Sequence, residues 1–134
     1  MKLLMKKPGG ELVFAETDEK YLMDCARNFF EKNTNMQRIA MQGTDIVMII
    51  DEDGLNKQLP FNFFMEFSSR YEPIQDIVGT ALFIRTLPAN PLEEDIWDYE
   101  VTDVTAEDVK YVAKLLSPEY QYKLIQILRE IYHL

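Results

Sequence analysis

Short apolar runs separated by turn residues dominate the first part of the chain. Leu3–Met5 and Leu12–Phe14 flank a loop with Pro8 and two glycines, which predicts a β-hairpin. The next apolar residues recur at helical spacing and predict a helix: Leu22, Cys25, Ala26, Phe29 and Phe30. We expect Asp18 to cap this helix and Asn33 to end it, because Asn tolerates the left-handed region.

The centre of the chain predicts the core of a sheet. Met36–Met41 and Asp45–Ile50 are expected to form two strands around Gly43. Apolar residues fill Ile46–Ile50 without alternation, which is typical of a strand covered on both faces. We expect a turn with Gly54 at positive φ, after which Leu55–Leu59 returns as the partner strand.

Two further segments complete this part of the pattern. Asn62 is placed to cap a short helix over Phe63–Ser68. Ile77–Ile84 predicts a second strongly apolar strand, in which Gly79 marks a bulge or a close approach of two backbones.

The pattern changes beyond Thr86. We expect residues 87–104 to form an acidic loop or edge strand, with the strand at Ile96–Val101. Thr105 and Asp108 have the spacing of a capping box, with Val104 and Val109 in the positions of a hydrophobic staple. Ser117 and Pro118 then begin a final helix. Its apolar stripe is Tyr120, Leu124, Ile127, Leu128 and Ile131.

These elements predict one α+β domain over residues 1–134. Its core is residues 1–86, and a C-terminal helical hairpin occupies residues 105–134. We expect a small mixed or antiparallel sheet of about five strands. An N-terminal helix and the two C-terminal helices would pack against it. A chain of 134 residues is long enough for one hydrophobic core.

The composition narrows the classes of function that the chain could have. The chain has 14 Lys and Arg against 23 Asp and Glu, a net charge of −9, which disfavours direct binding of nucleic acid. One His and one Cys do not suffice for a zinc site or a disulfide framework, and we expect no cofactor. We also expect a cytoplasmic protein, because we find neither a signal-peptide pattern nor an apolar stretch long enough for a membrane span.

Few residues could perform catalysis. Asp51-Glu52-Asp53-Gly54 follows a buried strand, and its carboxylates could hold Mg²⁺ in a hydrolase or nuclease, with Lys57 as an accessory cation. The simpler interpretation is an acidic hairpin turn. His133 lies at a helix end with no supporting partner, and Cys25 falls on an apolar helix stripe, so both are interpreted as structural.

An acidic segment is the main candidate site. Residues 93–108 contain eight acids and no Lys or Arg. Read as a strand, Trp97 and Tyr99 would share one face, and Asp98 and Glu100 the other, at a spacing of roughly 6–7 Å that resembles phosphates. The residues expected to bind a partner are Glu93, Glu94, Asp95, Trp97, Asp98, Tyr99, Glu100 and Asp103. The alternative is a solvated acidic edge anchored in the core by Trp97.

The order of several motifs over residues 1–86 carries a family resemblance. These are an opening strand with a Pro-Gly turn, an apolar strand, an acidic turn with Gly, a Leu-Pro-x-Asn motif and a late Gly-Thr: Met1–Gly10, Ile46–Ile50, Asp51–Gly54, Leu59–Asn62 and Asp76–Ile84. The chain resembles a family of small proteins, found largely in phages and mobile elements, that is catalogued as a domain of unknown function, serial number three thousand eight hundred and forty-six. The family usually has Gly-Gly where this chain has Phe29–Asn33.

The resemblance implies no catalytic residue, but it implies a setting in which small acidic proteins block host proteins. Together with the acidic segment, it predicts a non-enzymatic binding protein of a phage or mobile element. Its partner would be a host protein with a basic surface, such as a CRISPR effector or a restriction enzyme, inhibited by contact or by nucleic-acid mimicry. The alternatives are the metal-dependent hydrolase and a homodimer formed through Tyr122, Ile125 and Tyr132.

Overall fold

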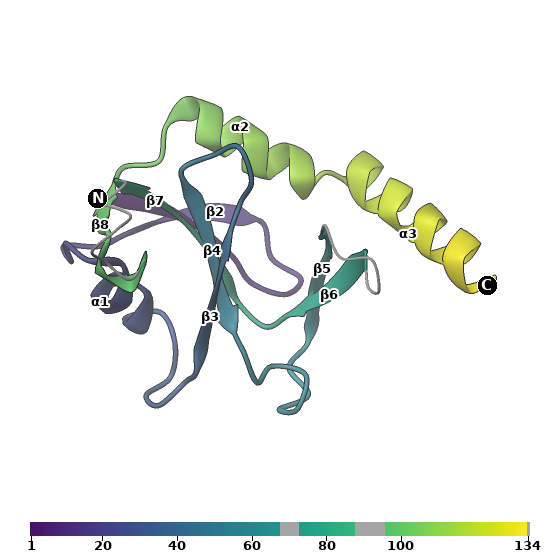
Figure 1. The fold of residues 1–134 in the computed structure, drawn as a ribbon, viewed down its shortest axis with the longest axis horizontal. Coiled ribbons are helices and arrows are strands. Elements are labelled where there is room, and N and C mark those ends of the chain that lie inside the picture. Colours follow the sequence, from purple (N-terminus) through teal and green to yellow (C-terminus); the bar gives the residue numbers. More distant parts are fainter. Residues whose placement is uncertain (68–72, 88–95, 134) are drawn as a thin grey trace.

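The computed structural model describes residues 1–67, 73–87 and 96–133 and confirms an α+β fold (Figure 1). Its main sheet is antiparallel and runs in the order β2-β1-β7-β4-β3, with β8 also paired to β7. A separate antiparallel pair, β5-β6, lies beside it. The described strands are β1 Lys2–Lys6, β2 Leu12–Glu16, β3 Met36–Ala40, β4 Ile46–Asp51, β5 Phe61–Glu66, β6 Ile74–Val78, β7 Ala81–Leu87 and β8 Glu100–Thr102.

Both hairpins expected early in the chain are confirmed. β1 pairs with β2 and β3 pairs with β4, each without a register shift. Gly9 and Gly43 supply the positive φ that these two turns require, at +71° and +77°.

The core lies on both faces of β4 and β7. Alternate residues of β4 point to opposite faces, and all six of its residues are buried. One face is covered by α1 (Leu22–Arg27), whose Leu22 and Cys25 are fully buried. The other face is covered by α2 (Ala106–Leu115) together with β5 and β6. The prediction of a strand covered on both faces is therefore confirmed.

The connection from β4 to β7 differs from the prediction. Residues 55–59 form turns and not a return strand, and β4 pairs with β3 and β7 instead. Gly54 does not adopt positive φ. It is required for space, because a Cβ at this position would lie 2.8 Å from Val78 Cγ2. Gly79 adopts positive φ instead, at +72°, and Leu59 packs against it. The single strand expected over Ile77–Ile84 is therefore divided at Gly79 into β6 and β7.

The segment after Pro60 is a strand and not the expected helix. Asn62 does not cap a helix; its side-chain amide donates to the carbonyls of Lys6 and Gly79 at 2.8 Å each. Its oxygen accepts from Lys6 Nζ at 2.9 Å. These bonds join β5 to the ends of β1 and β6, and this long-range pairing overrides the local capping signal.

Helix α1 is shorter than predicted. It ends at Arg27, and its N-cap is Tyr21, whose side chain makes no capping bond. Asp18 therefore does not cap it. Asn33 does adopt the left-handed region, with φ +70°, but in the loop that follows the helix.

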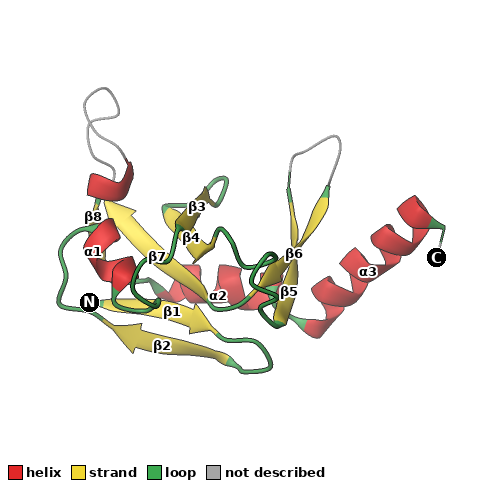
Figure 2. Ribbon diagram, turned by 90° about the horizontal axis from the view of Figure 1, so that it is seen from below, coloured by secondary structure: helices red, strands yellow, loops and turns green. Residues whose placement is uncertain are grey.

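The C-terminal helix boundaries are as predicted. The Thr105 side chain accepts from the Asp108 N–H, and the Asp108 side chain accepts from the Thr105 N–H, which completes the capping box. Ser117 caps α3 (Pro118–Tyr132), with Pro118 in its first turn. Helix α3 runs on from the end of α2 and does not fold back along it (Figures 1 and 2), so the helical hairpin expected over residues 105–134 does not form.

Helix α3 is fixed to the body by its first turns. The Gln121 side chain accepts from the Phe64 N–H at 2.9 Å and donates to the Phe64 carbonyl at 3.0 Å, as a neighbouring strand would. Leu124 is the fully buried residue of the helix, while Tyr122 and Tyr132 are exposed. In the described part of the chain, no helix has the length and apolar character needed to cross a membrane.

Candidate functional site

The acidic segment is not one continuous strand in its described part. A 3-10 turn, η1, covers Ile96–Asp98, and only Glu100–Thr102 pair as β8. The expected alternation of Trp97 and Tyr99 against Asp98 and Glu100 along a strand is therefore wrong. Three of the expected partner-binding residues lie outside the described residues: Glu93, Glu94 and Asp95.

The two aromatic residues of this segment fix it to the body. Trp97 is half-buried against the core face that α1 covers, and the Arg38 guanidinium lies 5.4 Å from the centre of its ring. The Tyr99 carbonyl accepts from the Leu22 N–H at 2.9 Å, at the start of α1. Trp97 through its side chain and Tyr99 through its backbone therefore fix the segment that carries the neighbouring carboxylates.

The described carboxylates of the segment have different surroundings. Asp98 is exposed. Glu100 forms an ion pair with Lys20 at 3.2 Å, and this raises the pKa of Lys20, mainly through the side-chain hydrogen bond. Asp103 Oδ1 accepts from the Lys2 N–H at 2.7 Å and helps to fasten the segment to β1.

A second acidic stretch, distant in sequence, lies alongside the first. The Lys20 carbonyl accepts from the Val101 N–H, and Tyr21 bridges to Glu100. Lys2, which binds Asp103, is paired across the hairpin with Glu16. We call the combined region the acidic surface; its described carboxylates are Glu16, Asp18, Glu19, Asp98, Glu100 and Asp103. It lies where the N-terminus, α1 and β8 meet (Figure 1).

Sequence reasoning did not predict the first half of this surface. Glu16, Asp18 and Glu19 are exposed, and they line a hollow of about 310 Å³ with Thr17 and Asn28. The position of Asp18 in the sequence indicated a helix cap and not a binding residue. Charge was the only sequence feature that these acids share with residues 98–103. The two stretches lie close together because residues about 80 positions apart pair with each other.

The acidic turn after β4 is internally satisfied. Asp51 is buried, and its two oxygens accept from the Asp53 N–H at 2.9 Å and from Lys57 Nζ at 2.7 Å. This hydrogen bond raises the pKa of Lys57. Asp53 accepts from the Asn35 amide at 2.9 Å. Within the described ranges, no three His, Cys, Asp or Glu side chains are grouped so that they could hold a metal ion.

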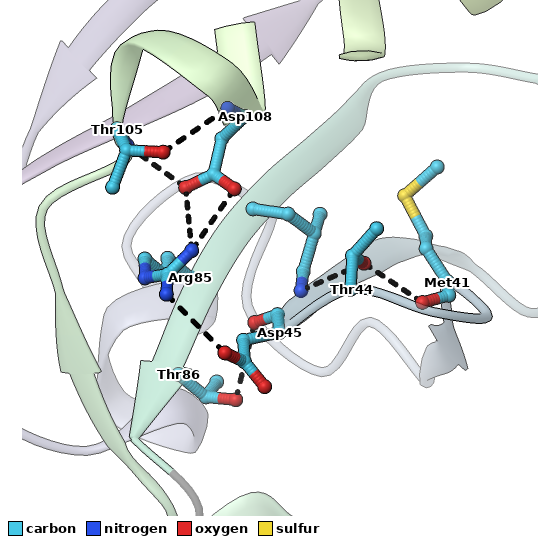
Figure 3. A network of polar contacts seen from close by, with 8 residues as sticks. Met41, Thr44, Asp45, Arg85, Thr86, Thr105 and Asp108 are labelled. Carbon is cyan, nitrogen blue, oxygen red and sulfur yellow. Dashed lines mark hydrogen bonds and ion pairs between the residues drawn. The ribbon is translucent and has the colours of Figure 1, made fainter.

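A second buried carboxylate joins α2 to the sheet (Figure 3). Arg85 on β7 donates from Nη1 to both oxygens of Asp108, at 3.0 Å each, and from Nη2 to Asp45 at 3.2 Å. Asp108 also closes the capping box with Thr105. The sequence predicted the cap but not the ion pairs. Arg85 is 23 residues from Asp108, and Asp45 is 40 residues from Arg85, so no local pattern indicated that these side chains meet.

Two hollows elsewhere have mixed linings. One, of about 600 Å³, lies between β3, β5 and α2. There the Tyr120 hydroxyl donates to Glu66 at 2.8 Å. Burial, and secondly the hydrogen bond to Glu66, raises the pKa of Tyr120 to about 12. The other, of about 440 Å³, is lined by both apolar and polar residues around the Asp51–Lys57 pair.

Cys25 and His133, which were also considered for catalysis, lie at positions that indicate structural roles. Cys25 is fully buried, and burial raises the pKa of its thiol, which disfavours the reactive thiolate. His133 is an exposed C-cap residue with φ +55°.

Comparison of the chain with known protein families, curated proteins and solved structures found no match. The resemblance over residues 1–86 therefore stays a prediction, and function must be argued from the surface itself.

Proposed function

We propose that this chain is a non-enzymatic binding protein that uses its acidic surface to contact a basic protein. The observation that carries the proposal is the alignment of two acidic stretches, residues 16–20 and 98–103, by backbone pairing. Pairing fixes the backbone that carries these carboxylates before a partner arrives, which reduces the entropy lost on binding.

The charge of the surface indicates the chemistry of its partner. Six described carboxylates stand against three cations, Lys2, Lys20 and the Met1 amino group, so the local field is negative. Such a field attracts a lysine- or arginine-rich surface, and it excludes one of like charge. Proteins that handle nucleic acids commonly present such surfaces. We therefore propose an inhibitor of a host nucleic-acid-handling defence protein, such as a CRISPR effector or restriction enzyme. The phage or mobile-element origin within this proposal rests on the family resemblance.

The test compares two variants of equal charge. The surface variant carries Asp18→Lys, Glu19→Lys and Asp98→Lys, which spares Glu100 and Asp103 because both make structural contacts. The remote variant carries Glu52→Lys, Asp76→Lys and Glu130→Lys at exposed positions. Each changes the net charge from −9 to −3.

Immobilised wild-type chain and both variants are exposed to the same bacterial lysate. We expect one or more basic proteins to be retained by the wild type and the remote variant and lost by the surface variant. Release of the captured protein by duplex DNA would support occupation of a nucleic-acid cleft. Equal retention by all three chains would contradict the proposal.

A further inference from the structure

The outer edge of β2 is open. β2 is the last strand of the main sheet, and no other described strand pairs with its outer side. Figure 2 shows it along one border of the sheet, with no helix over that border. An open edge displays backbone donors and acceptors that another chain can use.

The register identifies which backbone groups face outward. The Thr17 N–H donates to the Met1 carbonyl at 2.9 Å, and the Met1 amino group donates to the Thr17 carbonyl at 2.6 Å. Hydrogen-bonded and non-hydrogen-bonded pairs alternate along an antiparallel ladder. Leu12, Phe14 and Glu16 are therefore the β2 residues whose N–H and C=O point away from β1.

The Lys2 ammonium lies 5.8 Å from the centre of the Phe14 ring. Strand β2 itself is weakly protected at this edge, with Glu16 as its one charged residue. Its sequence has no Pro, no Lys and no bulge, which are the usual devices against edge pairing. Val13 is 44% exposed and Phe14 57% exposed. They lie on opposite faces of the sheet, since Val13 pairs with Met5 and Phe14 with Leu4.

The opposite edge of the sheet differs. Strand β3 carries Gln37 and Arg38, and the Arg38 side chain covers Trp97. Its most apolar exposed residue is the small Ala40. Polar and charged side chains of this kind disfavour pairing, so β2 is the edge that is suited to receive a strand.

Charge determines which strand would fit. Glu11 and Glu16 flank the apolar centre of β2, and Glu16 is continuous with the acidic surface. In an antiparallel pair of two copies centred on Phe14, Glu16 of one copy would lie opposite Leu12 of the other, and each copy carries a net charge of −9. The net charges of two copies repel each other, whereas a basic strand would be attracted.

We propose that the partner adds an extended segment, rich in Lys or Arg and alternating with apolar residues, to the outer edge of β2. Leu12, Phe14 and Glu16 supply the backbone bonds, and Val13 supplies the apolar contact on one face of the sheet. Glu16, on the other face, and the hollow beside Asp18 and Glu19 receive the basic side chains. This mode is strand addition to a sheet. The inference rests on the proposed function and names its docking element.

The probe is a capped hexapeptide of alternating lysine and valine, titrated into the ¹⁵N-labelled full chain. Three control peptides accompany it: one N-methylated at alternate residues, one with glutamate in place of lysine, and one with scrambled sequence of the same composition. Amide signals of Leu12, Phe14 and Glu16 report on β2, and those of Arg38 and Ala40 report on β3.

We expect the lysine–valine peptide to shift the three β2 amides and to slow their hydrogen exchange, with little change on β3. N-methylation should weaken binding at least about tenfold, since it removes the backbone donors. Phe14→Pro, which removes an outward N–H and spares the β1 ladder, should weaken binding more than Phe14→Ala.

The outcomes separate the two proposals. If the N-methylated and scrambled peptides bind as well as the probe, and only the surface variant abolishes binding, the acidic surface is supported and strand addition is overturned. If the probe shifts β2 amides equally in the wild type and the surface variant, strand addition is supported without the acidic surface. If β2 signals respond to protein concentration alone, a second copy occupies the edge and this inference is overturned.

Discussion

The buried carboxylates of Asp51 and Asp108 and the exposed carboxylates of the acidic surface are the same chemical group in opposite surroundings. Asp108 is 6% exposed and bonds both Arg85 and the start of α2, and Asp51 is 8% exposed and bonds Lys57. Asp18, Glu19 and Asp98 are exposed. Asp51 and Asp53 of the compact acidic turn make internal bonds, while acids from distant stretches remain at the surface. A run of like charges in sequence is therefore a poor guide to a binding site.

Removing the Asp108 carboxylate should have the largest effect on stability. Asp108→Ala leaves Arg85 without its bidentate partner and removes half of the capping box. We expect a loss of about 3 kcal/mol in the free energy of unfolding, from a broken, largely buried ion pair and a lost cap. Urea denaturation measures it. Asp45→Ala is the control, since its pair with Arg85 is more exposed, and an equal loss in that variant would contradict the account.

Asp51→Asn should cost less, about 1 kcal/mol, because Lys57 is partly exposed and the amide oxygen still accepts from the Asp53 N–H. The same turn was the candidate metal site. Since its oxygens are already bonded, calorimetric titration with Mg²⁺, Mn²⁺ or Ca²⁺ should give no binding heat from Asp51. A heat that disappears in Asp51→Asn would show a metal site at this turn, which the hydrolase alternative requires.

Glu66 is an intermediate case, because it accepts from a half-buried Tyr120. The folded-state pKa of Tyr120 is raised to about 12 from an ordinary value of 10.0, so the folded chain holds this proton more tightly than the unfolded chain. Stability contributed by the tyrosine is complete below pH 10 and is lost as pH rises towards 12. Tyr120→Phe should reduce the fall in stability across that window. An unchanged slope would show that the Tyr120 proton is not linked to folding.

Charge reversal on the acidic surface should have the smallest effect on stability. Asp18→Lys, Glu19→Lys and Asp98→Lys together should change the free energy of unfolding by no more than about 0.5 kcal/mol, because exposed charges contribute little. Thermal unfolding of this variant beside the remote variant tests it. A marked loss confined to the surface variant would place these side chains among the structural carboxylates.

Sequence patterning predicted the elements that depend on nearby residues. Both early hairpins, the buried strand β4 and the caps at Thr105 and Ser117 follow local rules of turn, periodicity and capping. The errors lie where tertiary contacts override local signals. Asn62 has capping chemistry but is held in β5 by Lys6 and Gly79.

The candidate site was predicted only in part. The stretch around Asp98 was identified from its charge, but its strand geometry was wrong, because η1 seats Trp97 against the core. The contribution of residues 16–20 depends on pairing between distant segments, which no local pattern specifies. The β2 edge likewise became evident only from the order of strands in the sheet.

The affinity of a captured basic protein as a function of ionic strength tests the central claim most directly. The wild type and the remote variant should lose affinity together across a tenfold range of NaCl concentration, because exposed charges are screened by salt. The surface variant should bind weakly at every concentration, with a flatter dependence. Binding by the surface variant that matches the remote variant in affinity and salt dependence would contradict the claim that the acidic surface is the binding site.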